Sequence, residues 1–153
     1  ALDLERFAMM PVGPLEKKLE ALVGWLRGAQ RDGAPRAHEA NARHRLARAA
    51  TEVEVARVLQ RRVISAALSG RIPTIESSQY KLFMNETGQR LANTALDLMG
   101  DEGALRPGEP NAPLGGRFER SYRYTVVDTI GGGASEIQKN IIARRGLGLP
   151  KNF

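Results

Sequence analysis

Apolar residues recur at intervals of three and four over long stretches of this chain, which is the period of helices that bury one face. The first such stretch runs from Leu4 to about Arg27. Pro11 and Pro14 interrupt it, so a kink or a break into two helices is expected there. Its apolar stripe consists of Phe7, Ala8, Val12, Leu15, Leu19, Leu22, Trp25 and Leu26. Glycine and proline within residues 31–35 then predict a turn.

The same period predicts two more long helices, one over about residues 38–68 and one over residues 74–99. Gly70 and Pro73 separate them, and Gly100 ends the second. The expected buried stripe of the first is Leu46, Ala49, Val53, Ala56, Leu59, Val63 and Ala66 or Ala67. That of the second is Tyr80, Phe83 or Met84, Gly88, Leu91, Ala95 and Leu98.

The remaining chain divides into a loop and two shorter elements. Residues 101–116 hold four glycines and three prolines, which predicts an irregular, mobile loop. Residues 117–130 carry several β-favouring side chains, but a lone strand would have no partner in a chain that is otherwise helical. We therefore expect a helix there, with its buried stripe at Phe118, Tyr122, Val126 and Ile130. The fold class that follows is all-α, an antiparallel four-helix-type bundle with a short C-terminal helix, in a single domain over residues 1–153.

The short C-terminal helix begins directly after three glycines, residues 131–133. Ser135 and Gln138 have the spacing of a capping box, and Ile137, Ile141 and Ile142 supply an apolar face. Glycines at a helix start let the backbone turn tightly and bring its N–H groups close to a ligand. From the residues alone, two interpretations stand: an ordinary turn with a good cap, or a backbone cradle for a ligand.

Composition narrows the class of protein. The 153 residues are 42% hydrophobic, enough for one domain with a core. The absence of cysteine excludes disulfides and thiolate metal sites, and it suits a cytoplasmic protein. His38 and His44 lie six residues apart, so no helical two-histidine metal site is expected. No apolar run has the length of a membrane span, and the first residues do not resemble a secretion signal.

The net charge of +6 allows an anionic partner such as nucleic acid, an anionic membrane or a phosphorylated cofactor. Between residues 36 and 62 there are seven arginines against three glutamates, so a basic helical interaction or nucleic-acid-binding module is one alternative. However, no aromatic residue lies between Trp25 and Tyr80, so bases would have no stacking platform. We favour a solvated arginine face and expect no nucleic-acid partner.

The segment of residues 131–150 resembles the C-terminal signature of acyl-CoA dehydrogenases, usually Gly-Thr-Ser-Glu-Ile-Gln followed by a helix. Residues 2–6, Leu-Asp-Leu-Glu-Arg, look like the start of that family's C-terminal domain. Residues 44–47 and 51–54 look like its next helix. The resemblance implies the C-terminal helical bundle of a larger FAD enzyme that also has an N-terminal helical domain and a middle β-domain.

The family's reaction is the α,β-desaturation of an acyl-CoA thioester, with electrons passed to an electron-transfer-flavoprotein-like acceptor. The resemblance also implies a homo- or hetero-oligomer assembled through the bundle. A fragment of this kind is expected to be inactive by itself, because the flavin and acyl-chain sites require the middle domain.

The resemblance assigns roles to individual residues. Many members carry a catalytic glutamate in the glycine loop, where this chain has Gly132. Other members place the base on the first helix, and the matching carboxylate here is Glu5. Asp3 and Arg6 would lie near the adenosine end of CoA, and Gly132 would offer its N–H to the thioester oxygen. Gly133, Ala134 and Glu136 would lie against the flavin nucleotide. Without the resemblance, Glu5 is a solvated carboxylate and Asp3 with Arg6 an exposed ion pair.

Two departures from the family pattern concern FAD. The usual Arg-x-x-Phe-Gly before the second helix reads Ala29, Asp32 and Gly33 at its defining positions, although Arg27 or Arg31 could substitute for the arginine. The usual Gln-x-x-Gly-Gly after the third helix is replaced by residues 97–101, which begin and end with aspartate. A second interpretation within the family is therefore a non-catalytic or FAD-poor partner subunit of a heteromeric dehydrogenase.

Overall fold

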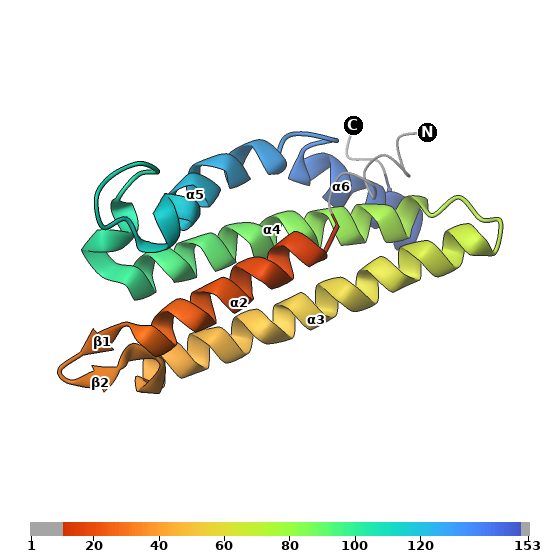
Figure 1. The fold of residues 1–153 in the computed structure, drawn as a ribbon. Helices are drawn as coiled ribbons and strands as arrows, with labels where there is room; N and C mark the ends of the chain where they lie inside the picture. Colours follow the sequence, from red (N-terminus) through yellow and green to blue (C-terminus); the bar gives the residue numbers. More distant parts are fainter. Residues whose placement is uncertain (1–10, 151–153) are drawn as a thin grey trace.

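The structure is a computed structural model that describes residues 11–150. Four helices, α2 (Gly13–Gly28), α3 (Ala40–Leu68), α4 (Thr74–Met99) and α5 (Arg117–Asp128), each run antiparallel to the preceding one. A short helix, α6 (Ser135–Ile141), continues into a π-helical turn over Ile142–Gly146 (Figure 1). The predicted all-α bundle with a short C-terminal helix is confirmed. None of the helices within residues 11–150 is long and apolar enough to cross a membrane.

The described chain enters α2 through Pro11 and Val12, and Pro14 occupies the first turn of that helix. A proline is tolerated there because its missing N–H would have no partner within the helix. The earlier part of the predicted first helix lies outside the described residues. After α2 comes a hairpin of two very short strands, β1 (Gln30–Arg31) and β2 (Ala34–Pro35). Asp32 and Gly33 connect them with positive φ angles, so the predicted turn is a two-residue hairpin turn.

Helix α4 is the central element, with α3 along one side and α5 and α6 along the other (Figure 1). The α3 stripe is built from small residues, which lets the two long helices approach closely. The buried residues of these helices include Ala49, Val53, Ala56, Val63 and Ala66 of α3 and Tyr80, Met84, Leu91, Ala95 and Leu98 of α4. These are the positions that the helical period predicts, while Leu46 and Leu59 are only partly buried beside them.

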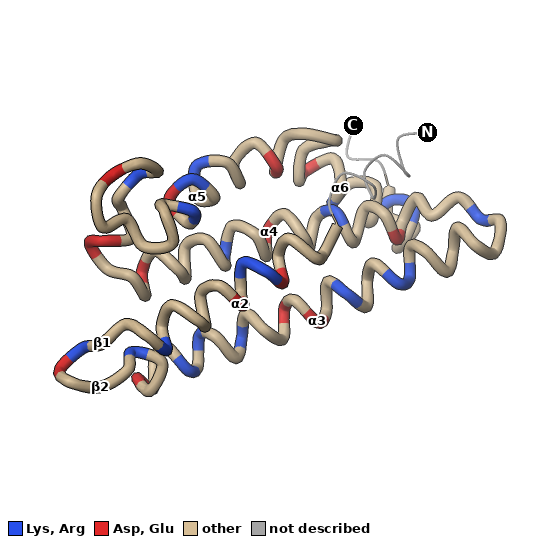
Figure 2. Tube along the Cα trace, in the orientation of Figure 1, with Lys and Arg blue, Asp and Glu red and all other residues tan. Residues whose placement is uncertain are grey.

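Four of the seven arginines between residues 36 and 62 form ion pairs, and two of them pair with a carboxylate on another helix. Figure 2 shows where the basic and acidic residues lie along the chain. Arg45 of α3 contacts Asp97 of α4 at 2.6 Å, and Arg57 contacts Glu16 of α2 at 2.7 Å. Arg36 is buried, lies 5.5 Å from the Trp25 ring centre and donates to the Met99 carbonyl. Arg36, Arg45 and Arg57 therefore connect elements of the bundle. The arginines of this stretch that form no ion pair among residues 11–150 are exposed.

Helix α5 buries a different face from the one its apolar pattern predicts. Phe118 is buried, but Tyr122, Val126 and Ile130 are between 48% and 65% exposed. Ser121 and Thr125 are buried instead. A Cβ atom added to Gly88 of α4 would lie 3.8 Å from the Thr125 methyl group, so the two helices meet through small side chains. The helix was predicted correctly and its buried stripe was not, because close approach to α4 selects small residues over large apolar ones.

Residues 101–116 are irregular, as predicted, and contain two short 3-10 segments, Gly100–Ala104 and Pro113–Gly116. Gly116 has a φ of 73° and lies against the backbone of a neighbouring segment. A Cβ atom there would collide with the backbone of Arg106 and Pro107. This contact sets the direction in which the chain enters α5.

We expect Gly116→Ala to lower the free energy of unfolding by at least about 2 kcal/mol, because it adds a backbone clash to the strain of a left-handed conformation. The matched control is Gly115→Ala. Gly115 also has a positive φ, of 65°, but an added Cβ would meet nothing within 4 Å. Thermal unfolding of both variants measures the difference, and equal midpoints would show that the contact with Pro107 is unimportant.

Candidate functional site

The glycine loop joins the end of α5 to the start of α6 and folds back on itself. Gly132 and Gly133 have φ angles of 66° and 102°, a region that favours glycine because it has no Cβ. The Ser135 N–H donates to the Thr129 carbonyl at 3.1 Å and closes the loop. The three consecutive glycines are thus used for a tight reversal of the chain.

Three buried polar side chains hold this loop by its carbonyl oxygens. Lys81 Nζ donates to the Gly133 carbonyl at 2.5 Å and to the Asp128 carbonyl at 3.4 Å. Asn85 Nδ2 also donates to Asp128, at 2.5 Å. Gln138 Nε2 reaches back from α6 to the carbonyls of Gly133 and Gly132, at 3.0 and 3.3 Å. Since buried carbonyl groups require donors, these bonds fix the loop against α4.

Sequence reasoning missed Lys81 and Asn85. Their signal was present: they lie four residues apart on one helical face, and each follows a core residue of the α4 stripe, Tyr80 or Met84. Two polar residues at that spacing beside a buried stripe indicate a polar partner across the helix interface. The identity of that partner, a loop more than 40 residues later in the chain, is not visible in the pattern.

The predicted capping box is wrong. Ala134 precedes α6 and Ser135 is its first helical residue, and no side chain caps the helix. Gln138 is buried and bonds to loop carbonyls, while Ile137 is 49% exposed. Gln138 therefore lies on the buried face of α6. Leaving the loop carbonyls without its amide donor would cost more free energy than exposing about half of Ile137.

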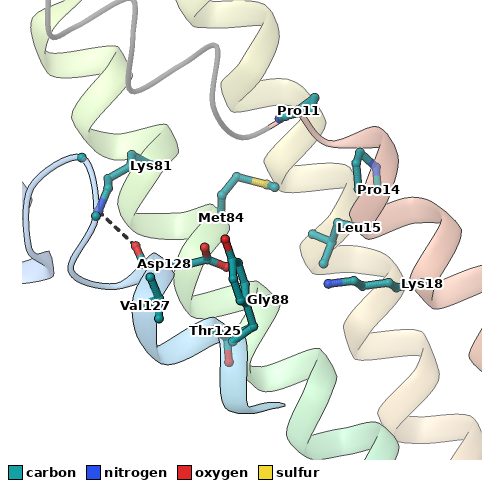
Figure 3. Close-up of a pocket in the computed structure, with 13 residues that line it drawn as sticks. Pro11, Pro14, Leu15, Lys18, Lys81, Met84, Gly88, Thr125, Val127 and Asp128 are labelled. Atoms are coloured by element: carbon teal, nitrogen blue, oxygen red, sulfur yellow. Dashed lines mark hydrogen bonds between the residues drawn. The ribbon is translucent and has the colours of Figure 1, made fainter. Parts of the chain in front are cut away.

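A cavity of about 350 Å³ lies beside the loop, between α2, α4 and α5 (Figure 3). Leu15 of α2, Met84 of α4 and Val127 of α5 form apolar parts of its wall. Gly131 and Gly132 contribute the loop side. Its size falls within the range of small-molecule sites, which are mostly apolar with a few polar groups.

Two charged side chains, Lys18 of α2 and Asp128 at the end of α5, also line this cavity. Burial lowers the pKa of the Lys18 ammonium, while the Asp128 charge partly opposes that shift and Arg117 adds to it. Burial raises the pKa of the Asp128 carboxyl, against the opposing effects of Lys18 and Lys81. The cavity is thus partly shielded from water, so charges within it interact more strongly than at an open surface.

The residues assigned by resemblance fall into two groups. Gly132 lines the cavity, Gly133 and Ala134 complete the turn, and Glu136 is exposed in the first turn of α6. Asp3, Glu5 and Arg6 lie outside the described residues. Pro11, the first described residue, lines the same cavity as Gly132. The structure therefore brings the glycine loop and the beginning of the described chain to one site.

The opposite end of the bundle carries the positions that depart from the family pattern. Ala29 directly follows α2, and Asp32 with Gly33 forms the hairpin turn. Arg31 forms an ion pair with Glu39 at 3.4 Å. The carboxylate of Asp97 likewise has an arginine partner, Arg45. These two ion pairs thus neutralise Arg31 and Asp97 within the chain.

A sequence model of the C-terminal domain of acyl-CoA dehydrogenase matches residues 1–147. Acyl-CoA dehydrogenase FadE26 of Mycobacterium tuberculosis is 28% identical over 155 residues, which cover 98% of this chain. Acyl-CoA dehydrogenase IpdE1 of the same organism is 42% identical over 72 residues, covering 46% of this chain and 17% of IpdE1. The chain spans only 38% of the length of FadE26.

Two solved structures superpose on nearly the whole chain. The ChsE4–ChsE5 complex from Mycobacterium tuberculosis gives a TM-score of 0.85 at 27% identity, covering 94% of this chain and 36% of the matched one. The steroid ACAD Tcur3481–Tcur3483 gives 0.87 at 28% identity, covering 99% of this chain and 38% of the matched one.

We expect Lys81→Met to loosen the glycine loop, because it removes a charged donor from a buried carbonyl. The free energy of local opening should fall by about 1–3 kcal/mol, measured as faster amide hydrogen exchange of residues 129–138. Lys139→Met is the control. Lys139 is exposed, and its ion pair with Glu86, at 3.8 Å, is a long surface pair that does not involve the loop. Unchanged exchange in Lys81→Met would mean that Asn85 and Gln138 suffice to hold the loop.

Proposed function

The chain belongs to the acyl-CoA dehydrogenase family, in which it forms the C-terminal helical domain, and we propose that it serves in the α,β-desaturation of an acyl-CoA thioester. The observation that carries this proposal is the cavity beside the glycine loop, where a fixed turn of backbone meets a largely apolar space. An acyl chain needs apolar walls and exclusion of water, and a thioester oxygen needs hydrogen-bond donors.

The walls suit the hydrocarbon part of the substrate. Leu15, Met84 and Val127 present carbon and sulfur atoms, and Met84 adapts readily to different ligand shapes. At the loop, Gly132 offers its backbone N–H to the thioester oxygen as negative charge develops during removal of the α-proton. The hydrogen bonds from Lys81 and Gln138 to the Gly133 carbonyl support this role, because donors that are fixed in advance need not reorganise during the reaction.

Glu5 is the base in this proposal, and its carboxylate takes the α-proton. Pro11 lines the cavity, and six residues of chain span at most about 20 Å, so the separation of Glu5 from Pro11 in the sequence is compatible with this role. A carboxylate among apolar groups has a raised pKa and is a stronger base than it is in water. Asp3 and Arg6 lie toward the adenosine end of CoA in this scheme.

FAD, when bound, accepts the β-hydrogen as a hydride. The glycine-loop end of this chain fits such a cofactor, since Gly133 and Ala134 keep large side chains away from it and Glu136 is exposed beside them. At the hairpin end Arg31 is paired with Glu39, so binding of the pyrophosphate there would depend on Arg27, which is exposed. In this proposal the chain contacts FAD mainly through the glycine loop. An electron-transfer-flavoprotein-like acceptor would receive the electrons from the flavin.

Assembly with other subunits is part of the same proposal. The outward faces of α3 and α5 expose large apolar side chains, which is costly in water and typical of surfaces that are covered in the complete protein. Leu68 is 85% exposed, at the end of α3. The exposed apolar residues of the two helices are Val55, Val58, Ile64, Leu68, Tyr122, Tyr124, Val126 and Val127. In this proposal, other domains of the enzyme, or a like or unlike partner subunit, cover them, apart from Tyr124 and Val127, which line the cavity.

The ion pairs at the hairpin end favour a second candidate within the family, a FAD-poor subunit that completes the site of a homologous partner. The ChsE4–ChsE5 structure, to which this chain is similar, is a complex. In this chain Asp97 and Asp101 stand where the family usually has an amide and a glycine, and although Arg45 pairs with Asp97, the Asp101 carboxylate would repel a bound pyrophosphate. The two candidates differ in flavin content and in the effect of removing Glu5.

Glu5→Gln in the complete enzyme should lower the rate at which acyl-CoA bleaches the flavin absorbance by at least about a hundredfold, since the amide cannot accept the α-proton. Assembly and flavin content should stay unchanged. Glu20→Gln, an exposed position on α2, is the matched control and should retain full activity. Full activity of Glu5→Gln would show that another group is the base and would favour the partner-subunit candidate.

Flavin content separates the candidates without any mutation. The desaturase proposal expects the complete protein, purified alone, to be yellow and to transfer electrons from acyl-CoA to an acceptor dye. A colourless protein that gains flavin and activity only on mixing with a homologous subunit would overturn it in favour of the FAD-poor candidate. The measurement is the ratio of flavin to protein absorbance before and after mixing.

A further inference from the structure

Lys18 is an unusual residue for the wall of an apolar cavity. It projects from α2 into the space between α2 and α5, opposite Lys81 of α4 (Figure 3). Among residues 11–150, no hydrogen bond or ion pair engages its ammonium group. Lys81, by contrast, is fully buried and bonded to the glycine loop. Two lysines thus line one cavity, and only Lys81 has a bonding partner within the loop.

A half-buried ammonium without an ion-pair partner costs free energy that a leucine at the same helical position would avoid. The depressed pKa of Lys18 has the same origin, partial loss of hydration. Asp128 faces Lys18 across the cavity but forms no ion pair with it. An oxygen atom of a ligand placed beside Lys18 would offset this cost.

The surroundings of Lys18 are more basic than acidic. Lys18 also lines a second hollow, of about 490 Å³, which shares Tyr124 and Thr125 with the first cavity and extends to Arg117 and Arg120. Among the described residues, Asp128 is the only acidic side chain that lines either space. The two hollows therefore form a continuous lining along α5. It is mostly apolar beside the glycine loop, includes Lys18 in the middle and reaches Arg117 and Arg120 at the other end.

We propose that Lys18 determines substrate specificity by binding a carboxylate at the far end of the acyl group. This inference rests on the proposed function, because it takes the thioester to be held at Gly132 and the acyl chain to follow the cavity past Leu15 and Met84. The ammonium of Lys18 donates a charge-assisted hydrogen bond to the carboxylate, and Arg117 and Arg120 favour the same negative charge from the adjoining hollow. The substrate class is then acyl-CoA with a terminal carboxyl group, as opposed to plain fatty acyl-CoA.

The test uses the complete enzyme and pairs of straight-chain acyl-CoA substrates of equal length, one ending in a methyl group and one in a carboxylate. The wild-type enzyme should have the higher kcat/KM for the carboxylate member of the best pair. Lys18→Met keeps the length of the side chain and removes its charge. We expect this variant to lower that preference by about 10- to 100-fold, mainly through KM for the carboxylate substrate.

Two further variants control for indirect effects. Lys18→Arg keeps the positive charge and should keep most of the preference. Lys17→Met removes a neighbouring exposed lysine that lines neither hollow, and it should leave the preference unchanged. The thermal unfolding midpoints of all variants show whether the fold is preserved.

The outcomes separate this inference from the proposed function. Equal wild-type efficiency for both members of every pair overturns the role of Lys18 without any variant. A preference that survives in Lys18→Met overturns it too. Higher efficiency for a terminal hydroxyl or ketone than for a carboxylate, lost in Lys18→Met, overturns the assignment of a charged group. Absence of turnover with every acyl-CoA, in an enzyme that carries flavin, overturns the proposed function and the inference with it.

Discussion

Buried hydrogen bonds to the carbonyls of the glycine loop are the interaction on which the cavity depends. A loop with glycines at positive φ has many accessible conformations, and fixing one of them costs conformational entropy. Lys81, Asn85 and Gln138 offset that cost from two helices, because each would otherwise be a polar group buried without a partner. The loop side of the cavity is thus held to α4 and α6 by hydrogen bonds.

The polar anchoring of the loop has consequences for the packing of its neighbours. Because α4 uses Lys81 and Asn85 on the side that faces α5, that interface is polar and narrow, and small residues such as Gly88 and Thr125 occupy it. The large apolar residues of α5 are displaced to the outside, where Tyr122 and Val126 remain exposed. The polar residues Lys81 and Asn85 of α4 thus account both for the anchored loop and for the apolar residues on the outer face of α5. In the proposed function, other parts of the enzyme cover this apolar surface.

The two ends of the bundle differ in what they offer to a ligand. At the loop end, glycine backbone, an apolar wall and Lys18 surround an open space. At the hairpin end, arginines and carboxylates neutralise one another in pairs such as Arg31 with Glu39. In the proposed function, this asymmetry favours an acyl site near Gly132 over a complete FAD site within this chain.

The sequence by itself determined the helices, the fold class and the family. Periodicity over α3 and α4 gave their bounds to within a few residues, because long amphipathic helices repeat one signal many times. The signature of residues 131–150 identified the family without any knowledge of contacts. Only the tertiary structure decided which face α5 and α6 bury, that Ser135 caps nothing, and that Lys18 enters the cavity beside Gly132. The physical reason is that helical period reports local burial, whereas hydrogen bonds such as Lys81 to Gly133 join residues 52 apart and override it.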